Sequence, residues 1–542
     1  MSNSFFWKDD SNHSNIESSI FDKIQNDFIK NGDLAYAGEL LKIAYEKYPN
    51  NIALIHQNQS LTYKEFYFRS ILFSRKLKAS GIKPRDKVLI FSENSIAFYI
   101  AYFAVWQIGA IAVPVNIFLH AKELSYIIKD SEPVAIICSS LLKSNIEDLV
   151  TQNYLDNLPA IFTNQDIDFV SPIPGDKSSP DKSTSDTELL SSFEVERLET
   201  DELCLLLYTS GTTGTPKGVM LSSRNIMTNA IQAYSRFNMM GLTDKERFFC
   251  VLPLFHVFAQ NACLWLPLIT GSTIIIVQKI DRKLILEGLK HQPTLFLGFP
   301  ALYGLLCMMK TAPLDSVKVF VSGADMLPDK IRQAFGMVYG RKICAGYGLS
   351  EASPIVAVNY CNNSMPTHFV GRPLAGIECD IRDDDGKSLP HGTIGHLWIR
   401  GGNIMIGYYK SSAATAKVMD GNWLNTGDLG LVDSRRYLAI SGRVKDIIIH
   451  KGFNIYPAEI ENVLLRHPDV FKAAVVGQED SDSGQIPVAF VAIKSKNNGI
   501  EASLRSLCTN NLAAYKVPRK FVCVEDLPMN STGKVDKKQL RI

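Results

Sequence analysis

The stretch that decides the fold is residues 208–218, YTSGTTGTPKG, which follows the apolar run LCLLLY at residues 203–208. A short, almost wholly apolar run predicts a strand buried on both faces. Glycines after such a strand let several backbone N–H groups point to one side, and serine and threonine hydroxyls extend this anion-binding nest. Lys217, just after Pro216, adds a full positive charge. The loop therefore predicts phosphate binding, although such turns are more often plain surface loops and the spacing is not that of a Walker A loop.

Composition limits the classes of protein to which the chain can belong. A chain of 542 residues with 46% apolar content predicts two or more globular domains. The net charge of +2 comes from mixed charges without a basic stripe, which argues against a nucleic-acid partner. The 10 cysteines are scattered without a C-x-x-C pair, which predicts reduced thiols and a cytoplasmic protein.

Two uncharged runs, residues 96–119 and 251–277, resemble membrane spans at first sight. Both contain polar residues and proline, and the first is better explained as a buried helix at 96–108 followed by a strand at 110–115. The polar N-terminus also lacks the basic start and apolar core of a signal peptide. We therefore expect no transmembrane span, while peripheral contact with a membrane stays open.

The order of apolar and amphipathic stretches predicts an α/β fold with a largely parallel sheet. Apolar runs predict strands of this sheet at residues 87–91, 134–138, 203–208 and 317–321. After about residue 370, short strands broken by Gly and Asp, at 397–400 and 437–440, predict a β-rich subdomain. A last α+β unit begins near residue 445, with a helix at 457–466 and a strand at 473–476. Residues 1–35 are expected to form a polar, partly helical extension, and their sequence indicates no catalytic or binding site.

Residue types downstream of the loop suit nucleotide chemistry. The stretch GYGLSE at 346–351 combines an aromatic face for a purine, flexible backbone and a carboxylate for a hard cation. Asp428, in the turn TGD, could accept hydrogen bonds from the two hydroxyls of a ribose. Taken alone, Glu351 is an ordinary solvated acid, Asp428 a turn residue and Lys534 a surface charge. Their order along the chain carries the argument.

In that order the sequence resembles the adenylate-forming (AMP-binding) superfamily, and within it the fatty acyl-CoA and acyl-ACP synthetases. The resemblance covers residues 36–540 and rests on YTSGTTGTPKG, GYGLSE, TGD, GRVKD at 442–446, GFNIYPAEIE at 452–461 and NSTGK at 530–534. It implies a large adenylation domain (36–442) of parallel-rich sheets with helices and a small β-rich subdomain. It also implies a hinge (443–445) and a small mobile α+β C-terminal domain (446–542).

The resemblance implies the following site residues. The implied catalytic residues are Lys534, Glu351, Lys217 and Thr209. The implied ligands of Mg²⁺ are Glu351, Thr209 and Thr212. The residues that bind ATP or AMP are Ser210, Gly211, Thr212, Thr213, Gly214, Gly323, Ala324, Asp325, Gly346, Tyr347, Gly348, Ser350, Asp428 and Arg443. Lys445 matches the hinge, and Lys451, Gly452 and Phe453 line the thiol entrance. The acyl pocket is formed by His256, Gly298, Phe299 and Tyr303.

The substrate predicted by the resemblance is a medium- to long-chain fatty acid. Amino-acid-activating relatives carry an aspartate where this chain has PLFHVF at 253–258, so an uncharged acyl group fits better. A glycine at 298 is expected to leave room for the chain to pass. The reaction uses ATP and Mg²⁺ and ends with transfer of the acyl group to a thiol.

The acceptor and two alternative functions stay open. Many members of the superfamily have Gly-Gly where this chain has Lys451-Gly452, which leaves both CoA and a holo acyl carrier protein as acceptors, and we expect either to arrive in trans. A luciferase-like or adenylate-releasing enzyme is one alternative. A non-catalytic protein that binds nucleotide or fatty acid is the other, although such a protein would not need the charges at Lys217 and Lys534.

Overall fold

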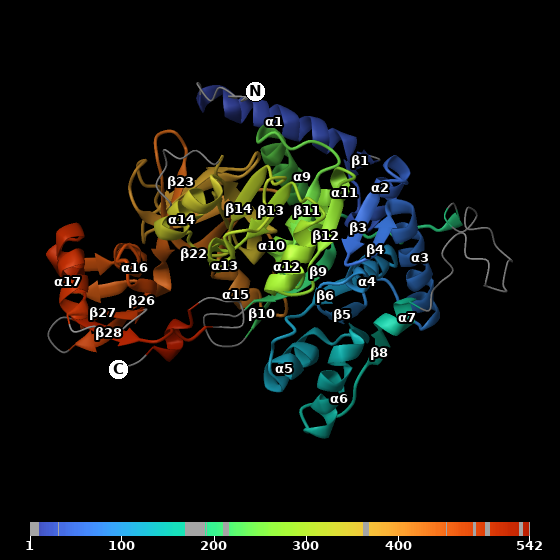
Figure 1. The fold of residues 1–542 in the computed structure, drawn as a ribbon. Helices are drawn as coiled ribbons and strands as arrows, with labels where there is room; N and C mark the ends of the chain where they lie inside the picture. Colours follow the sequence, from blue (N-terminus) through green and yellow to red (C-terminus); the bar gives the residue numbers. More distant parts are fainter. Residues whose placement is uncertain are drawn as a thin grey trace.

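The computed structural model describes residues 10–30, 32–168, 190, 192–209, 216–360, 368–450, 453–480, 484–493, 499–529 and 535–540 (Figure 1). The predicted site residues that lie outside these ranges are Ser210, Gly211, Thr212, Thr213, Gly214, Lys451, Gly452 and Lys534.

The first sheet contains the strand predicted before the glycine-rich loop. Its seven strands lie in the order β20-β10-β9-β6-β5-β7-β8. Their bounds are Gly407–Tyr408 (β20), Lys217–Ser222 (β10), Leu203–Thr209 (β9), Ile111–Pro114 (β6), Lys87–Phe91 (β5), Ala135–Cys138 (β7) and Ala160–Thr163 (β8). Strands β9, β6, β5, β7 and β8 run parallel, whereas β10 pairs antiparallel with both β9 and β20. The middle of β9 is buried, as its apolar sequence predicts.

The second sheet has 14 strands in the described part of the chain. In spatial order they are Glu378–Arg382 (β18), Gly395–Arg400 (β19), Trp423–Val432 (β22), Leu438–Arg443 (β23), Phe369–Pro373 (β17), Ile355–Val358 (β16), Cys344–Gly348 (β15), Val319–Ser322 (β14), Leu295–Gly298 (β13), Arg247–Cys250 (β11), Thr273–Ile276 (β12), Ile52–His56 (β3) and Gln59–Thr62 (β4), with Met419–Asp420 (β21) beside β22. Strands from β3 to β15 pair in parallel, and β15 to β18 pair antiparallel. The predicted β-rich region is therefore an antiparallel continuation of the parallel sheet.

Helices surround these two sheets. Their bounds are Asp10–Asp27 (α1), Leu40–Lys47 (α2), Tyr63–Ala79 (α3), Ile96–Gln107 (α4), Ala121–Ser131 (α5), Lys143–Thr151 (α6), Asn164–Asp168 (α7), Ser223–Met239 (α9), Val257–Gln260 (α10), Leu266–Ile269 (α11), Arg282–Leu289 (α12), Pro300–Met309 (α13), Asp329–Tyr339 (α14) and Ser412–Ala416 (α15). A short hairpin, Ile29–Lys30 (β1) and Asp33–Leu34 (β2), follows α1. Helix α4 is buried almost throughout, which explains its lack of charge. Across the described residues, no helix combines the length and the hydropathy that crossing a membrane requires.

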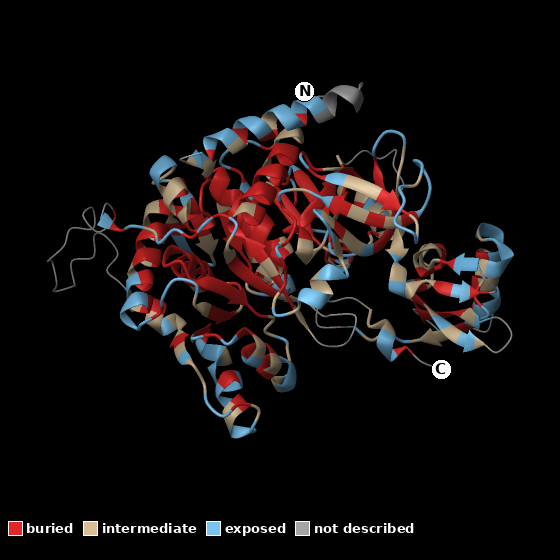
Figure 2. Cartoon of the chain, turned by 180° about the vertical axis from the view of Figure 1, so that it is seen from behind, coloured by how far each residue is buried: buried red, intermediate tan, exposed pale blue. Residues whose placement is uncertain are grey.

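The C-terminal part of the chain forms its own sheet and core (Figure 2). Its strands are Phe453–Ile455 (β25), Ile448–His450 (β24), Gly484–Ile493 (β27), Val470–Asp480 (β26) and Lys520–Val524 (β28), and its helices are Pro457–Leu464 (α16) and Ile500–Asn511 (α17). Lys330 of α14 reaches this unit, where its Nζ donates to the backbone oxygens of His467, Pro468 and Val470 at 3.2, 3.0 and 2.9 Å. An ammonium group thus satisfies carbonyls that follow the end of α16.

One of the cysteines that the structure describes departs from the prediction. Eight of the described cysteines are free thiols, and five of these eight are buried. Burial raises the pKa of Cys138 and of Cys508 to about 11, so both behave as inert core residues. Cys344, at the start of β15, is instead disulfide-bonded. The prediction of reduced thiols is wrong at Cys344, because the spacing of cysteines in a sequence does not reveal which thiols the fold brings together.

Candidate functional site

The parallel strands of the 14-stranded sheet end on one side, and several of the predicted site residues that the structure describes follow these strands. Strand β11 lies between β12 and β13, so the chain winds away from β11 in both directions. Such a switch in strand order leaves a crevice at the carboxyl ends of the strands, where ligands bind in α/β sheets. His256 follows β11, Phe299 follows β13 and Gly323 follows β14. The edge therefore gathers residues that are far apart in the sequence.

Lys217 and Thr209 face each other at the end of the β9–β10 hairpin where the two strands are connected. They are paired residues in the antiparallel register, on either side of loop residues 210–215. The ammonium of Lys217 lies 4.9 Å from the ring centroid of Tyr408. Tyr408 reaches this position because β20 pairs with β10, with Val219 opposite Tyr408. The ring of Tyr408 thus holds the cation of Lys217 in a cation–π contact.

Glu351 is held by the same segment that supplies Tyr408. It lies in a 3-10 turn, Ser350–Ala352 (η4), and its Oε1 accepts a hydrogen bond of 2.8 Å from the Tyr408 hydroxyl. Its backbone oxygen accepts from the N–H of Met405 at 2.9 Å, and Asn403 Nδ2 donates to the oxygen of Ala352 at 2.7 Å. Burial and the Glu351 carboxylate raise the pKa of Tyr408, so its hydroxyl stays a donor. The carboxylate is thus oriented from both its side chain and its backbone.

Tyr347 and Asp428 contact each other directly. The hydroxyl of Tyr347, in β15, donates to Asp428 Oδ2 at 2.6 Å, and Arg443 Nε lies 3.4 Å from Asp428 Oδ1. Asp428 and Arg443 are paired residues of β22 and β23. Burial, and then Asp428, raise the pKa of Tyr347 well above its ordinary value. A ribose at Asp428 would therefore share this carboxylate with Tyr347.

Glycines bring the backbone close to the predicted adenine position. Gly323 follows β14, and a Cβ added there would lie 3.1 Å from the ring of Phe258. Its neighbour Ala324 has a positive φ of 67°, and Asp325 is exposed with its Oδ1 accepting from the N–H of Met326. Gly346 lies on the adjacent strand, where an added Cβ would be 3.7 Å from the oxygen of Ser322. The missing side chain at Gly323 thus makes room for the ring of Phe258 beside the predicted adenine position.

The donors present suit a magnesium ion that is shared with phosphates. Glu351 offers one carboxylate and Thr209 one hydroxyl, and both are hard oxygen donors. Among the described residues there is no group of three or more His, Cys, Asp or Glu that could form an all-protein metal cage. Mg²⁺ commonly binds through one or two carboxylates, waters and substrate phosphates, so this donor set fits it.

The predicted acyl-pocket residues lie in two different environments. His256 and Phe299 are half-buried at the sheet edge, where the ring of His256 lies 4.6 Å from that of Phe255. Tyr303 is fully buried, and its hydroxyl donates to the oxygens of Phe296 at 3.2 Å and Val321 at 2.8 Å. Tyr303 therefore packs in the core beneath the strands and supports the sheet.

Gly298 is filled by its own neighbours. A Cβ at Gly298 would lie 3.1 Å from Leu302 and 3.2 Å from Tyr303. The missing side chain thus allows α13 to pack closely on β13. This packing does not favour the prediction that Gly298 opens a path for the acyl chain, because helix side chains occupy that space.

The predicted hinge residue Lys445 lies in the 3-10 turn Val444–Asp446 (η5), and Phe453 of the predicted thiol entrance begins β25. Desolvation, followed by the charge of Arg443, lowers the pKa of Lys445, and Lys538 near the C-terminus acts in the same direction. The ring of Phe453 is 56% exposed and lies 5.0 Å from that of Tyr515. The charge of Lys445 is thus disfavoured by burial and by the positive charges of Arg443 and Lys538.

Sequence reasoning missed Tyr408, which contacts two predicted catalytic residues. It belongs to the stretch GYY at 407–409, which carries no catalytic residue type in an obvious pattern. The only signal is its pairing with β10, almost 190 residues earlier in the chain. No local pattern in the sequence predicts such a pairing.

Two family descriptions match the chain. Residues 41–409 match the AMP-binding enzyme family, and residues 459–534 match the AMP-binding enzyme C-terminal domain. A long-chain-fatty-acid–CoA ligase from Escherichia coli O6:H1 is 28% identical over 525 residues, which cover 93% of each chain. A 4-coumarate–CoA ligase from Solanum tuberosum is 31% identical over 496 residues, which cover 89% of this chain and 88% of the relative.

A solved structure with the same fold is o-succinylbenzoate coenzyme A synthetase from Bacillus subtilis. Its complex with ATP and a magnesium ion has a TM-score of 0.79 and 27% identity, covering 93% of this chain and 99% of the other. Its complex with an acyl-adenylate intermediate has a TM-score of 0.80. These matches confirm the predicted α/β fold and the superfamily.

Proposed function

The chain belongs to the AMP-binding enzyme family, and we propose that it joins a medium- to long-chain fatty acid to CoA through an acyl-adenylate. It is an AMP-forming acid–thiol ligase, which is the activity on which its named relatives agree. The relatives differ in their acids, which range from long-chain fatty acids to 4-coumarate. The fatty acid is therefore the part of this function that we propose.

In the first half-reaction, an oxygen of the fatty acid carboxylate attacks the α-phosphorus of ATP. The new bond gives the acyl-adenylate, and the bond to the β-phosphate oxygen breaks to release pyrophosphate. Lys217 beside the loop, and Lys534 as the resemblance implies, place positive charge where negative charge builds, which stabilises the transition state. Glu351, with Thr209 and Thr212, would hold Mg²⁺, which neutralises phosphate charge when bound. Asp428 and Tyr347 orient the nucleoside.

In the second half-reaction, the thiol of CoA attacks the acyl carbonyl. The carbon–sulfur bond forms, the bond to the phosphate oxygen breaks, and AMP leaves. The thiol proton is lost to solvent or a nearby base. Lys445 at the hinge would allow the C-terminal unit to turn, so that Lys451, Gly452 and Phe453 line the path of the thiol.

The observation that carries the choice of a fatty acid is the apolar character of the sheet edge beside Gly323. The segment 253–258 contains no carboxylate to pair with a substrate ammonium. Its Phe258 packs against Gly323, and its Phe255 lies in edge contact with Phe118, whose side chain is 60% exposed. Aromatic and aliphatic surface at the site favours an uncharged acyl chain. The match to long-chain-fatty-acid–CoA ligases over 93% of the chain supports the same choice.

The test is an assay of the purified protein with Mg-ATP and a ladder of fatty acids of about eight to eighteen carbons. 4-Coumarate and o-succinylbenzoate serve as competing acids, and CoA or holo acyl carrier protein as acceptor. We expect AMP and acyl-CoA from the fatty acids, with kcat/KM rising with chain length as more apolar surface is buried. Turnover with the aromatic acids alone would refute the proposal that the substrate is a fatty acid. Formation of thioester on the carrier protein alone would refute CoA as the acceptor. Formation of adenylate without thioester would indicate the luciferase-like alternative.

A further inference from the structure

Four polar side chains lie in one stripe along helix α9, and all are buried. They are Asn225, Asn229, Gln232 and Arg236, whose spacing of four, three and four residues places them on one helical face. Asn229 and Gln232 are completely buried, and Arg236 is 1% exposed. A buried amide or guanidinium must find partners, because leaving it unpaired is costly. The hydrogen-bond partners of these four side chains therefore show which parts of the chain α9 keeps in position.

Each member of the stripe bonds to main chain rather than to side chains of the sheet. The donor–acceptor pairs are Asn225 Nδ2 to the oxygen of Gly402 (2.9 Å), Asn229 Nδ2 to the oxygen of Ile355 (2.7 Å), Gln232 Nε2 to the oxygen of Ala375 (2.8 Å), and Arg236 to the oxygens of Arg372 (3.2 Å), Pro373 (3.0 Å) and Val358. Asn229 also accepts from the N–H of Ile355 at 3.0 Å. The stripe thus fixes the backbone of β16, of the end of β17 and of the segment at 402.

These backbone segments carry the ATP side of the site. Gly402 directly precedes the segment with Asn403 and Met405, which bond to the turn that contains Glu351. Strand β16 pairs with β15, where Ala357 lies opposite Tyr347. A shift of α9 would therefore move both Glu351 and Tyr347. Asn229 also accepts a hydrogen bond from Asn261, which lies beyond His256 in the chain. The carbonyl oxygens that accept from Arg236 belong to β16 and β17.

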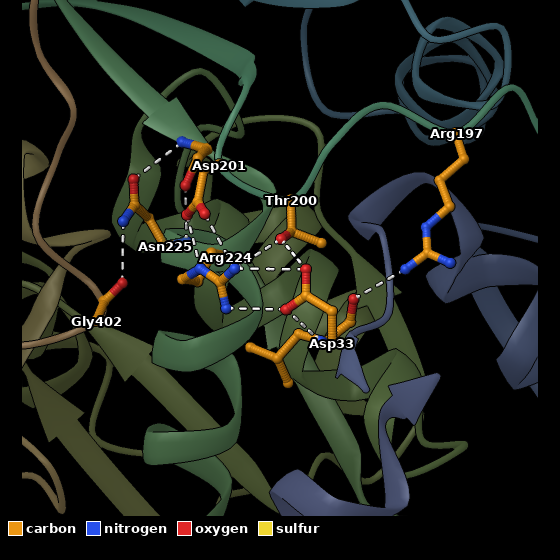
Figure 3. Close-up of polar contacts among 9 residues, drawn as sticks. Asp33, Arg197, Thr200, Asp201, Arg224, Asn225 and Gly402 are labelled. Atoms are coloured by element: carbon orange, nitrogen blue, oxygen red, sulfur yellow. Dashed lines mark hydrogen bonds and ion pairs between the residues drawn. The ribbon is translucent and has the colours of Figure 1, made fainter. Parts of the chain in front are cut away.

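The N-terminal segment forms ion pairs with α9 near both ends of this helix. At the start of α9, Arg224 donates to Asp33 Oδ1 at 2.9 Å, to Thr200 Oγ1 at 2.9 Å and to Asp201 Oδ1 at 2.6 Å (Figure 3). Near the end of α9, Arg236 pairs with Glu17 Oε2 at 3.0 Å, and the side chain of Glu17 is 5% exposed. Tyr360, which follows β16, donates to the same carboxylate oxygen at 2.8 Å. Helix α1 packs against α9 (Figure 1).

We propose that Glu17 of the N-terminal helix is a positioning residue for the ATP side of the active site, acting through Arg236 and helix α9. Its carboxylate neutralises the buried guanidinium, which then holds the backbone of β16 and β17 in the position that presents Tyr347. The N-terminal extension is thereby part of the catalytic domain. The inference rests on the proposed function, because the proposed function assigns Tyr347 to the binding of ATP and Glu351 to the binding of Mg²⁺.

The test compares Glu17→Gln with Asp22→Asn in the full-length protein. Asp22 lies on the same helix with its side chain exposed, so it controls for the loss of a carboxylate from α1. We expect Glu17→Gln to raise the KM for ATP about fivefold and to leave the KM for the fatty acid within twofold. Calorimetric titration with ATP in the absence of acid should show the same fivefold loss of affinity. Asp22→Asn should match the parent in all three measurements.

The possible outcomes separate the two proposals. A folded Glu17→Gln protein with unchanged ATP affinity, or with equal rises in both KM values, would overturn the positioning role. If Glu17→Gln does not fold, Tyr360→Phe replaces it under the same criteria, because it removes only one hydroxyl that donates to Glu17. A parent protein that binds ATP but forms no fatty acyl thioester would refute the proposed function, while the calorimetric comparison would still decide the role of Glu17.

Discussion

Replacing Tyr408 by Phe removes a single hydroxyl between two predicted catalytic residues. The ring stays in place, so the contact with Lys217 at 4.9 Å is kept, whereas the 2.8 Å bond to Glu351 is lost. A hydrogen bond to a charged group contributes about 1.5–3 kcal/mol, and Glu351 is only partly buried, so we take the lower end. A loss of about 1.5 kcal/mol corresponds to roughly a tenfold change in a binding or rate constant. Loss of a residue that orients a metal ligand has effects of the same order.

The assay is ATP–pyrophosphate exchange measured against free Mg²⁺, with calorimetric binding of Mg-ATP as a second readout. We expect Tyr408→Phe to lower kcat/KM for Mg-ATP about tenfold and to require more Mg²⁺ for half-maximal exchange. Tyr409→Phe is the matched control, because the ring of Tyr409 lies near Lys87 and Lys410 instead. An unchanged Mg²⁺ dependence in Tyr408→Phe, or an equal loss in Tyr409→Phe, would refute the reasoning.

Three further predictions follow from single residues. Lys534→Ala should abolish adenylate formation while sparing thioester formation from preformed acyl-adenylate, and equal loss of both half-reactions would contradict its assigned role. Gly348→Ala should weaken calorimetric ATP binding, because the added Cβ would overlap the backbone oxygen of Pro354 and separate β15 from β16; Gly304→Ala, where the nearest atom is 3.9 Å away, should leave ATP binding unchanged. The Thr200 hydroxyl first, then the N–H of Leu34 and Arg224, lower the pKa of Asp33 against the opposing effect of burial. Since the folded pKa lies below the unfolded value, Asp33 contributes stability that is complete above the unfolded pKa of about 3.9 and is lost as pH falls through the folded pKa. The free energy of unfolding in urea should therefore differ between the parent and Asp33→Asn by an amount that is constant from pH 7 to about pH 5 and shrinks below about pH 4. A difference that does not change with pH would exclude this linkage.

Local sequence pattern was sufficient for the elements that are long and clearly periodic. The apolar run before the glycine-rich loop is β9, residues 87–91 are β5, and the uncharged run at 96–108 is the buried helix α4. These predictions succeed because burial on both faces selects apolar residues at every position of a parallel strand or core helix. The prediction that Gly298 opens a path had no such basis, since only the packing of Leu302 and Tyr303 shows what fills the space.

The sequence by itself determined the family, the order of the elements and the residue types of the ATP site, because each motif combines chemistry with a turn or strand signal within a few residues. Only the tertiary structure decided which distant residues support that site. Tyr408 meets Glu351 through the pairing of β20 with β10, and Glu17 meets Arg236 across 219 positions of the chain. The physical reason is that a buried polar group is satisfied by whatever the fold brings within about 3 Å, and such a partner leaves no periodic trace in the sequence.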